Sequence, residues 1–397
     1  MRIGFVGCGY TADLYMEGIE RYPQLELIAV TDRKPDRLHA FGEYHRIETC
    51  DTIESLLSDY DIDLVVNLTN PNSHFEVTKM CLEAGKHVYC EKPMTVNFTD
   101  AQVLGELAER NSLYLASAPC GILGETAQTI WKAFKNGEIG TVKAVYAEYD
   151  DGPVQLQDPD IWRSVSGAPF PYKDEFQVGF PISHAGYFLT WFAAFFGPAK
   201  TITSYSSCLW PDKKVKEGDV VHVENPDMSI TCITFESGVV ARMTCTLLAP
   251  HNHNMQMIGD KGILKIQEVL NYNAPIYIDK YSDFKFRVQR YPISDRYPFI
   301  KAWLDPNYKE YPPMKKFSWK KRNARLRQDY LRGVAELSDA IMEKRRSRLP
   351  LDFCLHINEC IWAIQNVNES PYEVTTSFEP LHPLDDEALA KIAAIDW

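Results

Sequence analysis

The sequence has no apolar run of the length that a membrane crossing needs, no internal repeat and no low-complexity segment. A transmembrane helix takes about 20 consecutive apolar residues, so we expect no membrane-spanning segment. An apolar strand predicted from Ile3 leaves no room for a charged leader followed by a cleavage site. These absences predict an untargeted protein of the cytoplasm.

Paired cysteines and an excess of positive charge are also lacking. The ten cysteines are scattered, and no two of them form a Cys-x-x-Cys pair; this pattern is typical of a reduced, cytoplasmic chain. The chain has 42 basic against 54 acidic residues, a formal net charge of −12. Because such a charge repels phosphate backbones, nucleic acids and anionic membranes are excluded as partners of the chain as a whole.

The chain of 397 residues is long enough for two domains that need neither disulfides nor a structural metal. Near the N-terminus, short apolar runs alternate with amphipathic stretches, which is the pattern of a parallel sheet with helices on both faces. Strands are predicted at Arg2–Val6, Glu26–Thr31, Leu64–Leu68, His87–Cys90 and Leu113–Ala116, and helices at Phe75–Ala84, closed by Gly85, and Thr99–Arg110.

The pattern changes after about residue 120 to alternating strands and turns, which predicts a second α/β domain with a large, mainly antiparallel open sheet. We therefore divide the chain into residues 1–122 and 123–397. Residues 271–325 are rich in aromatics and proline and are interpreted as a packed functional or interface loop. The expected elements of this domain include strands at Val142–Tyr149, Met228–Phe235 and Val239–Leu247 and helices at Arg325–Arg346 and Phe353–Asn366.

A glycine-rich motif directly follows the first predicted strand and opens a helix. It reads Gly7-Cys8-Gly9-Tyr10-Thr11-Ala12, a Gly-x-Gly-x-x-Ala match in the context that indicates dinucleotide binding. Gly7 would allow a tight turn, Gly9 would let the backbone approach a pyrophosphate, and Ala12 would let the helix pack closely on its strand. The alternative is a turn with no ligand.

An acidic residue stands at the end of the second predicted strand. Asp32 is placed to bind the ribose hydroxyls of adenosine, which favours NAD because a 2′-phosphate would meet like charge. Arg33 follows directly, and a guanidinium beside the ribose can receive that phosphate. The sequence predicts NAD and keeps NADP open.

Three further segments carry a resemblance to a known family. They are Asn70-Pro71-Asn72-Ser73-His74, then Glu83-Ala84-Gly85-Lys86-His87-Val88, then Glu91-Lys92-Pro93. Together with the glycine motif they resemble the glucose-fructose oxidoreductase, inositol 2-dehydrogenase and rhizopine-catabolism (Gfo/Idh/MocA) family. The second domain is similar more loosely, through Trp162-Arg163, Phe196-Gly197-Pro198 and the turn at 259–262.

The resemblance implies a Rossmann domain followed by an open-sheet domain, with the substrate between them. In the family the lysine of Glu-Lys-Pro touches the reacting oxygen, a role that maps to Lys92. An ammonium is chemically suited to that role because it stabilises a developing alkoxide; the alternative is a solvated lysine. The resemblance also implies cofactor contacts at Tyr10, Thr11, Thr69, Asn70, His74, Glu91, Lys92, Trp162 and Arg163.

The sequence departs from the family at its acid-base pair. Many members place an aspartate and a histidine four residues apart at a helix start, where this chain has Ser183 and Tyr187. A tyrosine can act as base if a cation lowers its pKa from about 10, and Lys92 is the candidate cation. His184, one turn earlier, could be the base itself or an orienting group. We favour Tyr187; the alternatives are a core aromatic and a backbone-bonded histidine.

The remaining polar motifs are weaker. His251-Asn252-His253 has a spacing seen in metal sites, but no third ligand is evident, so it is interpreted as a loop and no metal is predicted. Residues 173–175 could contact a hydroxylated ligand or form a solvated face. The segment Leu355–Glu359 is interpreted as a structural helix, and a solvated loop is the interpretation for the basic cluster of Lys315, Lys316, Lys320, Lys321 and Arg322.

These features together predict an NAD(P)-dependent dehydrogenase or reductase of a sugar, a polyol or a sugar derivative, with Lys92 polarising the oxygen. Two alternatives remain open: a redox-neutral, NAD-dependent elimination or glycoside cleavage, and a noncatalytic nucleotide-sensing subunit. Because the antiparallel sheet needs cover on both faces and the predicted helices are too few, we also expect a homodimer or homotetramer.

Overall fold

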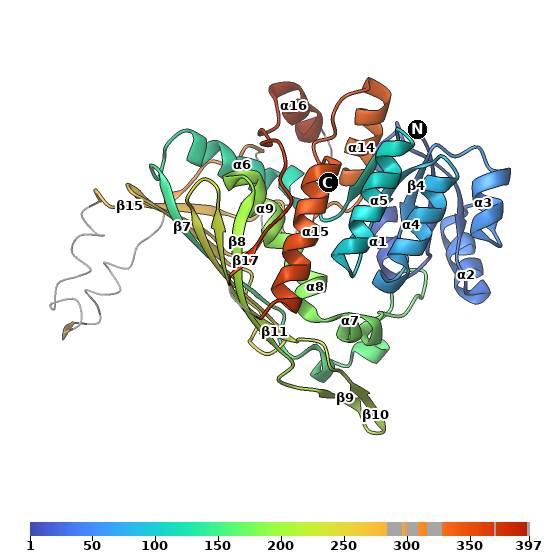
Figure 1. Ribbon diagram of the computed structural model, residues 1–397, viewed down its shortest axis with the longest axis horizontal. Coiled ribbons are helices and arrows are strands. Elements are labelled where there is room, and N and C mark those ends of the chain that lie inside the picture. The colour runs from blue at the N-terminus through green and yellow to red at the C-terminus, as the bar shows by residue number, and fades with distance from the viewer. Residues whose placement is uncertain (284–295, 298, 300–308, 316–327, 369–370, 395–397) are drawn as a thin grey trace.

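The computed structural model describes the chain apart from residues 284–295, 298, 300–308, 316–327, 369–370 and 395–397 (Figure 1). Its N-terminal part is a six-stranded parallel sheet in the order β3-β2-β1-β4-β5-β6. The strands are β1 Arg2–Val6, β2 Glu26–Thr31, β3 Thr49–Cys50, β4 Leu64–Asn67, β5 His87–Cys90 and β6 Leu115–Ser117. Its helices are α1 Tyr10–Met16, α2 Pro35–His45, α3 Ile53–Asp59, α4 His74–Glu83 and α5 Phe98–Arg110.

The strands of this sheet are covered on both faces, which explains why they are apolar throughout. Ile3, Phe5 and Val65 have no exposed surface, as expected for a parallel sheet between two helical layers. The strand order reverses between β1 and β4, and ligands of open parallel sheets bind at the carboxyl ends beside such a reversal. The predicted Rossmann domain is confirmed.

Within the described residues the second sheet has nine strands in the order β16-β15-β14-β13-β7-β12-β11-β8-β17, and only the β7–β12 pair among them is parallel. The strands are β7 Val142–Asp150, β8 Ala199–Ser207, β11 Met228–Phe235, β12 Val240–Thr246, β13 Met255–Gly259, β14 Gly262–Ile266, β15 Ile276–Lys280, β16 Lys309–Glu310 and β17 Tyr372–Glu373. A separate hairpin pairs β9 Asp212–Lys216 with β10 Asp219–His222. The predicted fold class is confirmed.

Helices cover one face of the second sheet (Figure 1). They include α8 Phe180–His184, α9 Gly186–Phe196 and α15 Leu351–Asn366, while α6 Glu125–Lys135 and α7 Tyr172–Val178 flank them. Short 3-10 turns lie at η1 Ile19–Arg21, η2 Pro71–Ser73, η3 Gly121–Leu123, η4 Val154–Leu156 and η5 Pro159–Ile161. Helix α15 runs between the sheet and α5, so it joins the two halves of the molecule.

The last helices pack back onto the first domain. Asn358 of α15 accepts the Thr95 N–H at 3.1 Å and donates to the Thr95 hydroxyl at 3.2 Å. In α14, Arg332–Glu343, a Cβ added at Gly333 would collide with the Tyr89 hydroxyl. The boundary at residue 122 stays a prediction.

The helix predicted at Arg325–Arg346 is confirmed over Arg332–Glu343, but its described ends are wrong, because α14 begins only at Arg332 and ends at Glu343. Asp329 lies before the helix, where its carboxylate accepts a hydrogen bond from the Tyr22 hydroxyl at 2.9 Å. Much of the predicted loop 271–325 and of the basic cluster lies outside the described residues; within the cluster, Lys315 donates to the Ile392 carbonyl at 3.4 Å.

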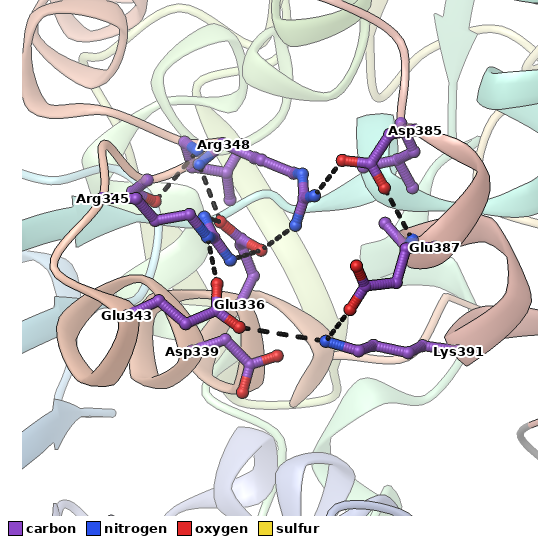
Figure 2. A network of polar contacts seen from close by, with 12 residues as sticks. Glu336, Asp339, Glu343, Arg345, Arg348, Asp385, Glu387 and Lys391 are labelled. Atoms are coloured by element: carbon purple, nitrogen blue, oxygen red, sulfur yellow. Dashed lines mark hydrogen bonds and ion pairs between the residues drawn. The ribbon is translucent and has the colours of Figure 1, made fainter.

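A polar network fixes the C-terminal helix α16, Asp386–Ala394, beside α14 (Figure 2). The nearly buried carboxylate of Glu336 accepts hydrogen bonds from Arg345 at 2.6 and 3.0 Å and from Arg348 at 2.9 Å. Arg348 also donates to Asp385 at 2.9 Å, just before α16. None of the helices within the described ranges is long and apolar enough to cross a membrane.

Candidate active site

A cleft of about 1300 Å³ lies at the carboxyl ends of the parallel strands and is closed on its other side by the second domain. Most of the sequence-predicted site residues line it: Gly7, Gly9, Tyr10, Thr11, Asp32, Arg33, Thr69, Asn70, His74, Glu91, Lys92, Trp162, His184 and Tyr187. Ala12 does not line the cleft but is fully buried, as its packing role requires. Arg163 lies outside it and donates to the carbonyls of Asp160 and Trp162.

Gly7 and Gly9 of the glycine-rich motif are required for different structural reasons. Gly7 has a φ of +103°, and a Cβ there would lie 2.7 Å from the Leu68 carbonyl carbon, so the turn itself requires glycine. At Gly9 the nearest atom to an added Cβ is Arg37 Nη1 at 3.9 Å, so the space above this residue is open. A dinucleotide pyrophosphate fits this arrangement, because the backbone at Gly9 faces the cleft without a side chain in between.

Asp32 is held by more partners than the sequence indicated. Its carboxylate accepts the N–H groups of Cys8 and Lys34, each at 2.8 Å. Arg37, in the first turn of α2, donates to both oxygens at 2.5–2.8 Å. Arg37 was not among the residues predicted from the sequence, although its place five residues after the acid could have been noted. Its guanidinium pairs with the Asp32 carboxylate, which by itself disfavours a 2′-phosphate.

His74 and Glu91 are anchors of the cleft floor. His74 is buried, with Nδ1 2.6 Å from the Pro93 carbonyl oxygen and Nε2 3.0 Å from that of Thr69, and burial lowers its pKa. Glu91 accepts the Tyr15 hydroxyl at 2.8 Å and the Lys92 N–H at 2.9 Å. Both residues act by holding the backbone segments that carry Thr69 and Lys92.

Lys92 follows β5 and extends over the second-domain wall of the cleft, whose aromatic residues include Tyr149, Phe180 and Tyr187. Its Nζ lies 5.5 Å from the centre of the Tyr187 ring. No hydrogen bond or ion pair joins this ammonium to any other residue in the described part of the chain. A cation that lines a cleft without an anionic partner is suited to an oxygen of a bound molecule.

The expectation that Lys92 lowers the pKa of Tyr187 is wrong. Burial raises it, and the nearby carboxylates of Glu91 and Glu175 add to the effect. A hydrogen bond with the Gln328 side chain lowers the pKa but does not reverse the shift. Tyr187 stacks on Tyr149 at 5.4 Å and stays a neutral phenol.

The His184 imidazole is kept neutral in the same wall. Burial and then the charge of Lys92 lower its pKa to about 4. Its ring stacks on Phe180 at 4.1 Å, and its Nδ1 is buried without a hydrogen-bond partner among the described residues. Ser183 does not orient it, because its hydroxyl donates to the Gly179 carbonyl instead.

The sequence left two interpretations open for residues 173–175, contact with a hydroxylated ligand and a solvated face, and the structure supports a different one at Lys173 than at Glu175. Lys173 pairs with Asp219 at 3.0 Å, away from the chemistry. Glu175 lines the cleft, and its Oε2 is buried with no hydrogen-bond partner within the described ranges. Glu175 Oε2 and His184 Nδ1, both without a hydrogen-bond partner among the described residues, can therefore hydrogen-bond to hydroxyl groups of a molecule bound in the cleft.

His251 and His253 of the triplet also line this cleft, and the expectation that no third side chain of a metal-ligating type lies beside them is wrong. Asp151, directly after β7, lies against both imidazoles, and Glu268 lies behind them. Although burial lowers the pKa of His253, its hydrogen bonds to Asp151 and Glu268 raise it to about 9. These residues come from separate strand ends, so spacing along the chain could not reveal them.

Comparison with known proteins shows where this architecture recurs. Residues 1–118 match the model of an oxidoreductase family with an NAD-binding Rossmann fold, and residues 127–265 match the C-terminal domain of the Gfo/Idh/MocA proteins. The myo-inositol 2-dehydrogenase of Thermotoga maritima is 28% identical over 141 residues, which cover 35% of this chain and 42% of that relative. The matched stretch thus spans about two fifths of the length of such curated relatives.

Two solved structures share the fold over nearly the whole chain. The WlbA dehydrogenase of Bordetella pertussis, in complex with NADH and UDP-GlcNAcA, has a TM-score of 0.67 at 17% identity and covers 92% of this chain and 94% of its own. KijD10, a 3-ketoreductase of Actinomadura kijaniata in complex with NADP, has a TM-score of 0.67 at 18% identity, covering 92% and 96%. With both of its domains matched, the chain belongs to the Gfo/Idh/MocA family of oxidoreductases with an NAD(P)-binding Rossmann fold.

Proposed function

We propose that the protein is an NAD(P)-dependent dehydrogenase or reductase of a sugar, a polyol or a sugar derivative. The observation that carries the proposal is the Lys92 ammonium, which has no hydrogen-bond or ion-pair partner among the described residues and lies in the same cleft as Gly7 and Gly9 of the dinucleotide turn. The relatives support the substrate class, since they include an inositol dehydrogenase and a dehydrogenase solved with a UDP-sugar.

The residues divide into two groups by role. Gly7, Gly9 and Asp32 would hold the dinucleotide, with Tyr10, Thr11, Arg33, Thr69, Asn70, His74, Glu91 and Trp162 around it. When bound, the nicotinamide accepts or supplies the hydride. Lys92 stabilises negative charge on the substrate oxygen. Glu175 Oε2 and His184 Nδ1, which have no hydrogen-bond partner among the described residues, bind other hydroxyls.

The direct test of this proposal is an assay of reduced-nicotinamide absorbance with a panel of sugars, polyols and nucleotide sugars. Net redox chemistry changes the absorbance in proportion to product. Product without any lasting absorbance change would support the redox-neutral alternative instead. Tight cofactor binding without conversion of any compound would support the nucleotide-sensing alternative.

The cofactor preference depends on Arg37. With Asp32 neutralised by Arg37, we expect the dissociation constants for NADH and NADPH to lie within about tenfold of each other, because one charged contact is worth about 1.5–3 kcal/mol. Replacing Arg37 by glutamine frees the Asp32 charge and removes a phosphate partner. Titration by nucleotide fluorescence should then show the preference for NADH widening by about tenfold or more. An unchanged ratio would rule out this role for Arg37.

We further propose Tyr187 as the direct proton partner of the substrate oxygen, with His184 orienting the substrate. A neutral phenol can donate a proton to an alkoxide that forms during reduction. Tyr187→Phe should lower kcat by about 100-fold, whereas His184→Asn should act mainly on KM. If steady-state kinetics show the reverse, His184 is the relay and Tyr187 only packs the wall.

The assembly and location stay proposals as well. The sheet face opposite the helices exposes apolar side chains on four neighbouring strands: Tyr146, Tyr205, Ile230 and Val240. We expect this face to be covered in a homodimer or homotetramer, so sedimentation at micromolar concentration should show no dominant 45.5 kDa species. The ten free thiols suit the reducing cytoplasm.

A further inference from the structure

We propose that Asp151, His251 and His253 bind a divalent transition-metal ion, with zinc as the best match, at the second-domain wall of the cleft. Asp151 Oδ1 lies 3.0 Å from His253 Nε2 and 3.7 Å from His251 Nδ1. Tetrahedral zinc with ligands at 2.0–2.1 Å places its ligand atoms roughly 3.3 Å apart. All three ligand atoms lie within 4.8 Å of one another, so small side-chain shifts would bring them around a single ion.

Glu268 supplies an independent argument. It lies behind both imidazoles, with Oε2 3.1 Å from His251 Nε2 and Oε1 2.9 Å from His253 Nδ1. Each ring thus faces Asp151 with one nitrogen and Glu268 with the other. In metal sites a ligating histidine donates its second N–H to such a carboxylate, which fixes the tautomer and directs the other nitrogen at the metal. At His253 the ion would displace the proton that Nε2 shares with Asp151, and this proton would be released to solvent.

The fold builds this arrangement at the only parallel strand pair within the described part of the second sheet. Because β7 and β12 run in the same direction, Asp151 and the 251–253 loop leave them at the same end. Backbone hydrogen bonds in both directions between Asp150 and Asn252, at 2.8 and 3.0 Å, lock the two segments together. The buried Tyr149 ring stacks on His253 at 4.1 Å and fixes its plane.

The donor set decides the class of ion. Two imidazole nitrogens and one carboxylate oxygen suit zinc and its first-row neighbours, whereas magnesium and calcium prefer oxygen ligands alone. Three protein ligands leave a fourth position, as in catalytic zinc sites. Asp151, His251 and His253 all line the cleft that holds Lys92, so that position is open to a substrate oxygen; this last step alone depends on the proposed function.

Zinc binding is measured on the full-length, tag-free protein after treatment with a chelator. Titration with zinc chloride against a competing chromophoric chelator should show one equivalent bound, and cobalt(II) in the same site should give the visible absorption of a four-coordinate ion. His251→Asn and Asp151→Asn should weaken zinc by more than about 100-fold, beyond the effect of losing an outer-shell partner. Glu268→Gln, which removes no ligand, should weaken it by about 10- to 100-fold.

The matched control is His222→Asn, at an exposed histidine that pairs with Asp212 at 2.8 Å outside the cleft. Its zinc affinity should equal that of the wild type. The proposal is overturned if the wild type takes up no zinc at micromolar free metal, or if His251→Asn and Asp151→Asn bind it as the wild type does. Because the readout is metal affinity, it is independent of whether any sugar is oxidised.

Discussion

Replacing Lys92 by methionine should lower kcat by about 100-fold or more, because one preorganised donor at a developing oxyanion is typically worth that much. Methionine keeps most of the aliphatic length and removes the charge. The Lys92 ammonium has no partner among the described residues that its loss would leave unpaired, so the fold should be unaffected. The dissociation constant of the cofactor should stay close to that of the wild type, since the proposed contact is with substrate.

The control for this variant is Lys173→Met, which removes a lysine from the nearby helix α7. Lys173 is exposed and pairs with Asp219 at 3.0 Å, so its removal should leave kcat unchanged. Steady-state kinetics and fluorescence titration of both variants give the comparison. A Lys92→Met enzyme that keeps more than about a tenth of the wild-type kcat would make the lysine a structural residue.

The second large effect is expected from Gly9→Ala, which should reduce cofactor affinity by about 10- to 100-fold without loss of stability. A methyl group at this position has open space in the free protein, and the φ of −81° accepts alanine. In the complex it would stand between the backbone and the pyrophosphate. A hydrogen bond to a charged group is worth about 1.5–3 kcal/mol, which sets the expected loss.

Gly7→Ala makes the complementary test, because it should destabilise the protein before any ligand is added. Its φ of +103° and the approach to Leu68 oppose any side chain, and a strained residue of this kind costs about 1–3 kcal/mol. Thermal unfolding and nucleotide titration separate the two cases. A Gly9→Ala protein that binds the dinucleotide as the wild type does would show that the pyrophosphate lies elsewhere.

Much of the first domain could be predicted from sequence because its elements are local. Strands β1, β2 and β5 have the predicted limits, since each is a short apolar run bounded by polar or glycine residues. The start of α14 was predicted wrongly because Asp329 accepts a hydrogen bond from Tyr22, some 300 residues away in the chain. No periodicity within a segment carries information about such a partner.

The candidate site shows the same division. Gly7, Asp32 and Lys92 were predictable because motif position fixes them at strand ends. The ion pair between Asp32 and Arg37 was not predictable, because it depends on the direction taken by the Arg37 side chain. The prediction for the pKa of Tyr187 was wrong for a similar reason. The sequence places the Lys92 cation nearby, but it does not show that burial raises the pKa by more than a cation lowers it.

The metal-ligand geometry at the second-domain wall was beyond sequence reasoning altogether. Asp151, His251 and Glu268 follow three different strands. The first two are brought together by the parallel pairing of β7 with β12 and by the antiparallel pairing of β7 with β13, which the Asp150–Asn252 bridge continues. A parallel pair inside an antiparallel sheet has no local sequence pattern of its own. The tertiary pairing, rather than the spacing of the histidines, supplied the third ligand.

Hydride transfer to or from a sugar-like carbon in this cleft can be followed with an isotope label. The most direct measurement uses reduced cofactor deuterated at nicotinamide C4, a panel of keto-sugars and nucleotide keto-sugars, and mass spectrometry of the products. We predict deuterium on a carbinol carbon of one product, in proportion to oxidised cofactor and lost in Lys92→Met. Cofactor that binds with its affinity intact but passes no deuterium to any compound would contradict the claim.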